Sequence, residues 1–294
     1  MLRVTPLPGN RQRLDGGAMF GNAPRALWSK WCEPDADDRI ELACRSLLVE
    51  DGERRLLLEA GIGAFFEPRL RARYGVTDEG HRLVDSLAAI GLAPADIDVV
   101  LLSHLHFDHA GGLLSPFQPG RPAELLFPRA RIVVGRAALE RARAPHRRDR
   151  ASYVPGMVEL LEASRRLDVV DDGEATHPSL GPRVELARSD GHTPGMLHAE
   201  VRGAARWVVY AADLVPGVPW THVPITMGYD RAAEQVVDEK VALLARVAAG
   251  RGLLAFTHDA RVALAGVEPD GRGSFRTVGE RTDGDGALDL DAPV

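Results

Sequence analysis

The 294-residue chain contains only two cysteines, Cys32 and Cys44, which are too few for a disulfide framework and fit a reducing compartment. It has no apolar run of about 18 residues, which excludes a membrane-spanning helix. The N-terminal stretch has no apolar segment of signal-peptide length. No pattern of about 20–50 residues repeats, which argues against solenoids and propellers. We therefore expect a cytoplasmic protein that folds around one core.

The chain also lacks an excess of positive charge, because 36 basic and 42 acidic residues give a formal net charge of −6. Such a chain is a poor candidate for wrapping nucleic acid. Its one basic patch, at residues 136–150, is interpreted as a solvated helix face. The expected partner is a small-molecule substrate, with no nucleic acid and no membrane. A homodimer is an open alternative.

Apolar patterns along the chain predict strands mixed with helices. Strands are expected at 39–50, 54–59, 99–103, 131–135, 183–187, 197–202, 206–211 and 252–256, and helices at 81–90, 137–144 and 230–249. Hairpins mixed with strand–helix alternation indicate an α/β protein whose sheets lie between helices. No linker divides the chain, so we expect one domain over residues 1–280. The Gly- and Asp-rich segment 281–294 is expected to be a flexible tail.

The most informative segment, SHLHFDHAGG at residues 103–112, directly follows the strand expected at 99–103. In an extended segment His104, His106 and Asp108 project to the same side, and His109 enters from the turn that the two following glycines permit. Three imidazoles and a carboxylate within six residues are too many ligands for one tetrahedral zinc. They suit two adjacent metal ions. The alternative is a polar loop whose histidines only form hydrogen bonds.

H-x-H-x-D-H after a buried strand resembles the metallo-β-lactamase superfamily, whose members fold as an αββα sandwich. That superfamily supplies further ligands from three later loops, and this chain has GHTPG at 191–195, YAADL at 210–214 and THD at 257–259. The resemblance implies one metal site at His104, His106 and His192, a second at Asp108, His109 and His258, and a bridging carboxylate at Asp213.

Within the superfamily the chain most resembles the N-acyl-homoserine lactonase and methyl-parathion-hydrolase-like group. The resemblance rests on DGGAMFG (15–21), ALW (26–28), ADLVP (212–216), MGYD (227–230) and EK (239–240). No cysteine lies near a motif, which disfavours a β-lactamase, and His106 replaces the glutamate of the flavodiiron branch. Two departures stand out. Glu59 occupies the position where the superfamily usually has an aspartate that contacts a ligand histidine. Pro216 occupies the position of the lactonases' catalytic tyrosine.

The resemblance implies a hydrolase in which a hydroxide that bridges two Zn²⁺ ions opens a lactone ring, with N-acyl-homoserine lactones as the first substrate class and quorum quenching as the implied role. Manganese, iron and cobalt are alternatives to zinc. Alternative activities are phosphotriester or aryl-ester hydrolysis at the same centre and a mononuclear-iron persulfide dioxygenase. A binding protein that keeps the fold without catalysis is a further alternative.

Ester cleavage also requires a proton for the leaving alkoxide. Asp108 is the first candidate for the proton donor and Tyr229 the second, although Tyr229 could simply pack. Met19, Phe20 and Trp28 are candidates to line the mouth of the site, and they would equally suit a core edge or a dimer contact. His222 is a candidate substrate contact, or a hydrogen-bonded loop histidine.

Overall fold

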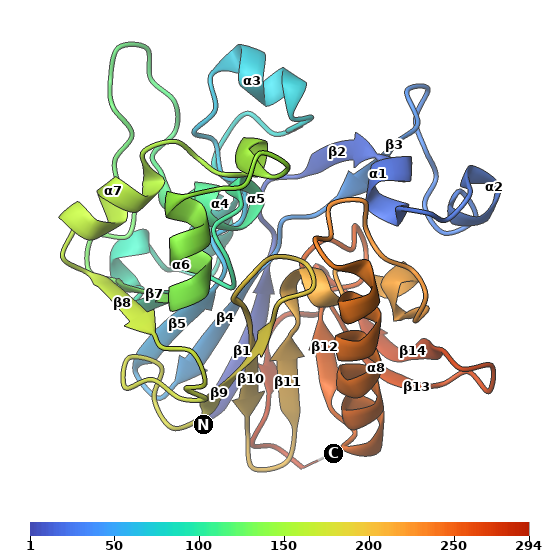
Figure 1. Ribbon diagram of the computed structural model, residues 1–294. Coiled ribbons are helices and arrows are strands. Elements are labelled where there is room, and N and C mark those ends of the chain that lie inside the picture. The colour runs from blue at the N-terminus through green and yellow to red at the C-terminus, as the bar shows by residue number, and fades with distance from the viewer. Residues whose placement is uncertain (294) are drawn as a thin grey trace.

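Two β-sheets pack face to face at the centre of the computed structural model, which describes residues 1–293 (Figure 1). The first sheet has the strand order β15 (Leu288–Asp289), β1 (Leu2–Leu7), β4 (Ser46–Asp51), β5 (Arg54–Leu58), β6 (Val99–Leu101), β7 (Arg131–Gly135) and β8 (Leu167–Val170). The second has the order β14 (Phe275–Arg281), β13 (Leu264–Pro269), β12 (Leu253–Ala255), β11 (Trp207–Tyr210), β10 (Met196–Arg202) and β9 (Val184–Ser189). A separate small sheet pairs β2 (Gln12–Asp15) with β3 (Arg39–Leu42).

Helices cover the outer faces of both sheets. Within residues 1–293 the α-helices are α1 (Gly16–Phe20), α2 (Arg25–Trp28), α3 (Pro68–Arg73), α4 (Arg82–Ala89), α5 (Phe107–Ala110), α6 (Arg136–Arg143), α7 (Met157–Ala163) and α8 (Ala233–Ala249). Helices α4, α6 and α7 lie against the first sheet, and α8 lies along the second (Figure 1). The structure thus confirms the αββα sandwich.

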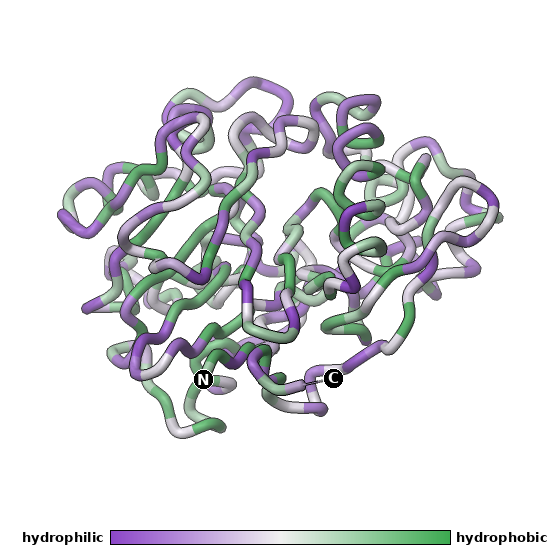
Figure 2. Tube along the Cα trace, turned by 90° about the horizontal axis from the view of Figure 1, so that it is seen from below, coloured by the Kyte–Doolittle hydropathy of each residue, from purple (hydrophilic) through white to green (hydrophobic). Residues whose placement is uncertain are grey.

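The two-residue period of the strands explains why the first sheet needs a layer on each side. In β6, Val99 and Leu101 join the core between the sheets, whereas Val100 joins the core under the helices. The apolar side chains of β4 alternate in the same way, because Leu47 and Val49 join the core between the sheets and Leu48 joins the core under the helices. In Figure 2 hydrophobic stretches of the chain pass through the interior, and hydrophilic stretches are frequent at the outer turns.

The expectation of one strand over 39–50 is wrong, because the segment forms two strands in different sheets. Strand β3 pairs with β2, β4 pairs with β1 and β5, and residues 43–45 lie between them. In this break Ala43 N–H donates to His258 O over 3.2 Å, and Arg45 N–H donates to Thr257 O over 2.9 Å. Local alternation did not reveal the break, since the residues before and after it share the same apolar pattern.

The segment expected to be a flexible tail, 281–294, is packed in the structure as far as residue 293, and Val294 lies outside the described residues. Leu288 pairs with Val4 in the first sheet, and Leu290 is fully buried. Asp283 forms an ion pair with the buried Arg45. Two leucines and one acidic side chain anchor this segment, which its Gly- and Asp-rich composition did not indicate. No helix within residues 1–293 combines the length and apolar character needed to cross a membrane.

Candidate metal centre

The motif residues meet at one edge of the sandwich, where several strands end. His104 and His106 follow β6, and Asp213 lies in the short 3₁₀ helix η4 (Ala212–Leu214) after β11. His258 follows β12, which runs parallel to β11, so both strands end at the same edge. His192 lies in the turn between β9 and β10. The fold therefore brings together residues that are distant in sequence.

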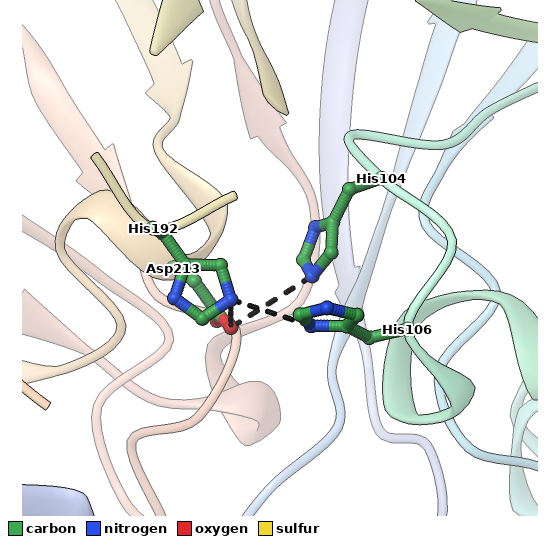
Figure 3. A group of neighbouring side chains, drawn as sticks. All are labelled: His104, His106, His192 and Asp213. Atoms are coloured by element: carbon green, nitrogen blue, oxygen red, sulfur yellow. Dashed lines mark hydrogen bonds and ion pairs between the residues drawn. The ribbon is translucent and has the colours of Figure 1, made fainter. Parts of the chain in front are cut away.

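Four of these side chains form a first group, His104, His106, His192 and Asp213, whose ligand atoms all lie within 4.8 Å of one another. All four are buried. Figure 3 shows them pointing toward a common centre, with His104 and His106 on one side and His192 and Asp213 on the other. This is the set that the sequence predicts for one metal site, with the predicted bridging carboxylate included.

Asp108, His109 and His258 form a second group, also within 4.8 Å of one another. Asp213 lies between the two groups. Its Oδ2 is 3.1 Å from His192 Nε2 and 3.3 Å from His109 Nε2, while its Oδ1 is 3.1 Å from His258 Nε2. One carboxylate thus faces nitrogens of both groups, which is the position that a bridging ligand requires.

Acceptors behind the histidines orient the rings. His109 Nδ1 lies 3.1 Å from Glu59 Oε2, His192 Nδ1 lies 2.8 Å from Asp230 Oδ1, and His258 Nδ1 lies 2.7 Å from the Ala43 carbonyl. Because carboxylate and carbonyl oxygens accept hydrogen bonds, each Nδ1 carries a proton, and each Nε2 is the nitrogen that faces the centre. His104 has Ser103 Oγ at 2.9 Å from its Nδ1.

His106 is oriented differently. Its Nδ1 lies 3.3 Å from His192 Nε2, so Nδ1 is the nitrogen that faces the first group. The ring of Tyr153 packs against it at 4.9 Å between centroids, and the Tyr153 hydroxyl lies 3.3 Å from Thr193 Oγ1. Tyr153 therefore fixes the ring by contact rather than through an acceptor.

Glu59 reaches its histidine from an unusual backbone conformation. Its φ of +68° lies in the left-handed region, where a non-glycine residue is strained. From there Oε1 accepts from Ser103 N–H at 2.6 Å, and Oε2 contacts His109. The longer carboxylate that replaces the superfamily's usual aspartate thus contacts a predicted ligand and also holds the start of the motif loop.

The buried nitrogens of the two groups fit divalent metal ions. Nε2 of His104 and His109 makes no hydrogen bond within residues 1–293, although both rings are fully buried. A buried nitrogen lone pair without a donor is costly, and an ion would satisfy it. Imidazole and carboxylate ligands suit zinc and neighbouring transition metals. The His/Asp cluster is therefore suited to divalent metal ions.

The electrostatics of the cluster agree with this reading. Burial would favour the neutral acid of Asp213, but three neighbouring imidazoles hold the pKa of this carboxyl well below its usual range. Burial, together with adjacent imidazoles, lowers the pKa of His104 well below the usual histidine value. Burial would also lower the pKa of His109 and His258, but the nearby Asp213 carboxylate outweighs it and raises both pKa values well above the usual histidine value. A bound ion would therefore displace a proton from each of these two rings.

A cavity of about 150 Å³ opens onto both groups, and its walls include Asp108, Asp213 and His258. Met19, a candidate for the mouth, and Tyr229, a candidate proton donor, both line it, and Met227 and Tyr74 complete the apolar side.

The other predicted mouth residues lie elsewhere. Phe20 is fully buried and stacks between Trp28 and Trp220, with centroid separations of 5.7 and 4.7 Å. Phe20 and Trp28 therefore belong to the core edge. His222 stacks on Trp31 in a larger groove of about 1200 Å³, which adjoins the cavity at Leu42 and His258, but His222 does not line the cavity itself. Apolar composition alone did not distinguish a cavity wall from the core beside it.

Sequence reasoning gave no role to Asp230, which orients His192, although its MGYD segment was part of the resemblance. It also missed the contacts of Ser103 and Tyr153. No local signal marks the Ala43 carbonyl, because any residue carries one.

Comparisons with known proteins agree with this geometry. The family description "Metallo-beta-lactamase superfamily" matches residues 39–258. A solved structure of a probable metal-dependent hydrolase from Staphylococcus aureus superposes with a TM-score of 0.84 at 26% identity, covering 96% of each chain. A solved dizinc quorum-quenching lactonase superposes with a TM-score of 0.74 at 20% identity, covering 95% of each chain, which shows the shared fold.

An N-acyl homoserine lactonase from a Bacillus species is 27% identical over 169 residues, covering 53% of this chain and 57% of that protein. The match to each of the first curated relatives likewise spans only 57% of the relative's length.

Proposed function

Because this chain belongs to the metallo-beta-lactamase superfamily, we propose that it is a hydrolase with two divalent metal ions that opens lactone rings. N-acyl-homoserine lactones are the proposed substrate class. The observation that carries the proposal is the pair of ligand groups that share Asp213. The similarity to a Bacillus N-acyl homoserine lactonase supports the choice of substrate.

The two groups would hold one ion each. The ligands would be His104, His106 and His192 for one ion, Asp108, His109 and His258 for the other, and Asp213 for both. Zinc is the first choice, with manganese, iron and cobalt as alternatives. Two such ions, when bound, polarise a substrate oxygen and lower the pKa of water to about 7.

The chain itself supplies orientation and a proton. The cavity walls of Met19 and Met227 would hold the apolar part of the substrate against the ligand groups. Tyr229 lines the same cavity with 41% of its surface exposed, and its partial burial, together with the charge of Asp108, raises the pKa of its hydroxyl. The hydroxyl therefore stays protonated at neutral pH and could protonate the leaving alkoxide. Asp108, at the cavity wall, is the alternative donor.

Ring opening of a medium-chain N-acyl-homoserine lactone by the zinc-loaded protein, followed by proton release, tests the proposal. We expect kcat/KM above about 10⁴ M⁻¹s⁻¹, within the normal range for a native substrate. The same preparation is assayed on an aryl ester and a phosphotriester. A preference of orders of magnitude for either would overturn the lactone assignment and keep the hydrolase. No hydrolysis of any of the three would contradict the hydrolase itself.

Tyr229→Phe separates the two proton donors. If Tyr229 donates the proton, we expect kcat to fall about 10²-fold while KM changes little. An unchanged kcat would assign the proton to Asp108. The metal content of the variant should stay at the wild-type value, because Tyr229 belongs to neither ligand group.

A further inference from the structure

Helix α8 packs against the two loops that meet behind His192. One is the turn at residues 190–195, which carries His192, and the other is the segment 222–230, which ends at Asp230. Backbone N–H groups of Arg231 and Ala232 donate to Gly191 O at 3.0 and 2.8 Å, so the loops join just before α8 begins. The helix can therefore set the position of both loops.

Glu239 of α8 holds the histidine loop. Its Oε2 accepts from Ser189 Oγ at 2.5 Å and from Gly191 N–H at 3.3 Å, and its Oε1 accepts from Asp190 N–H at 3.0 Å. One carboxylate thus satisfies three donors in the residues just before His192. Charged acceptors make the stronger hydrogen bonds, so this contact fixes the loop backbone.

Gly191 brings the same loop close to α8. A Cβ at this position would lie 2.6 Å from Val236 Cγ2 and 2.7 Å from Val236 N, both in α8. Only glycine allows this approach, and it places the loop backbone within reach of Glu239.

Lys240, the next residue, holds the other loop. Its side chain is fully buried, and Nζ donates to the carbonyls of Ile225 and His222. Lys240 is one of only two lysines in the chain, and burial lowers its pKa to about 8. It remains largely protonated at neutral pH and so keeps its donor protons.

A side-chain hydrogen bond, from His192 Nδ1 to Asp230 Oδ1 at 2.8 Å, also joins the two loops. The second oxygen, Oδ2, accepts from Met227 N–H at 2.7 Å, so Asp230 is fixed by the loop that Lys240 holds. We propose that Glu239 and Lys240 are positioning residues that together set the tautomer and place of His192. The proposal deepens the proposed function and rests on it, since His192 acts as a ligand there.

The proposal predicts selective damage to one ligand group. Lys240→Met removes both hydrogen bonds that Nζ donates and keeps a side chain of similar length. Glu239→Gln removes the negative charge that holds the histidine loop. In either variant we expect one of two metal equivalents to bind about tenfold more weakly, as loss of an outer contact does. The other equivalent should bind as in the wild type. Competition with a chromophoric zinc chelator measures both.

A second readout needs no metal and no substrate. In metal-free protein labelled with ¹⁵N-histidine, the Nδ1–H of His192 should give a resonance shifted downfield by the Asp230 carboxylate. We expect both variants to broaden this resonance and to leave those of His109 and His258 in place. An unchanged His192 resonance and unchanged binding of both metal equivalents would overturn the proposal.

A double variant shows whether Lys240 acts through Asp230. If it does, Lys240→Met adds little to the weaker binding caused by Asp230→Asn, whereas additive losses would contradict that route.

The matched controls are Asp238→Asn, at an exposed neighbour on α8, and Lys30→Met, at the exposed second lysine. If Lys240→Met fails to fold, Glu239→Gln and the histidine spectrum still decide. Because neither readout uses turnover, failure of the lactonase assay and failure of the positioning role are distinguishable.

Discussion

The two halves of the centre are supplied by the chain in different ways. The first half, His104 to His109, comes from six consecutive residues after one strand. The second half, His192, Asp213 and His258, comes from three loops spread over residues 192–258. Glu59 supports the first half directly, whereas the second depends on Asp230, on the Ala43 carbonyl and on the helix behind them. A contiguous motif needs one well-placed neighbour, and a dispersed one needs the tertiary structure.

Asp213→Ala should have the largest effect, because this residue lies between the two ligand groups. We expect kcat/KM to fall more than about 10³-fold, since both groups lose the carboxylate between them. Metal analysis should show fewer than two ions per chain, and circular dichroism should show an unchanged fold. A variant that retains two ions and its activity would contradict the shared role of Asp213.

Glu59→Gln and Asp230→Asn compare the two halves directly. Each removes the charge behind one histidine, so each should weaken one metal equivalent by about 10- to 100-fold. Glu59→Gln should act on the group of His109, and Asp230→Asn on the group of His192. Cobalt substitution followed by absorption spectroscopy distinguishes the two sites. Identical spectra of the two variants would contradict the idea that Glu59 and Asp230 each stabilise a different metal site.

Arg45→Met tests whether the second half depends on Arg45, which is distant in sequence from the loop of His258 and hydrogen-bonds on both sides of it. Buried Arg45 donates to the carbonyls of Phe256 and Asp259, on either side of His258, and pairs with Asp283. Removing it leaves these acceptors without a hydrogen-bond donor, and we expect a loss of about 3 kcal/mol in the free energy of unfolding. Urea denaturation of the metal-free protein measures it. The exposed Arg276, paired with Glu268, is the matched control, and Arg276→Met should change stability by less than about 1 kcal/mol.

The smallest effect concerns His198, which is buried in β10 of the second sheet. Burial lowers its pKa from 6.5 to about 4. Between these two pH values the unfolded chain binds a proton that the folded chain rejects, so stability is lost as the pH falls. We expect His198 to contribute about 2 kcal/mol to the loss between pH 7 and pH 5. Urea unfolding at both pH values should show a smaller loss for His198→Asn; an equal loss would rule out this contribution.

Sequence patterns predicted most of the regular elements near the centre. The strand at 131–135 coincides with β7, and the helix at 230–249 contains α8. They missed β1, β2, β8, β13, β14 and β15. They also joined β3 to β4, because the break at 43–45 exists only where that backbone pairs with residues 257 and 258. The sequence left Phe20 and Trp28 open between the mouth, a core edge and a dimer contact, because an aromatic residue has the same local pattern in each.

The sequence by itself determined which ligand types stand together after β6, since three imidazoles and a carboxylate lie within six residues at the end of a buried strand. The expectation that an extended segment brings Asp108 to the side of His104 and His106 is wrong, because Asp108 lies in helix α5 and groups with His109 and His258. It also determined the layered fold, because strands that are apolar on both faces require a layer on each side. Only the tertiary structure decided which acceptor orients each ring. It decided, too, that Asp213 faces both groups and that two adjacent side chains of α8 hold the loops behind His192. These contacts join segments far apart in the chain, and their energy depends on distances that no local pattern encodes.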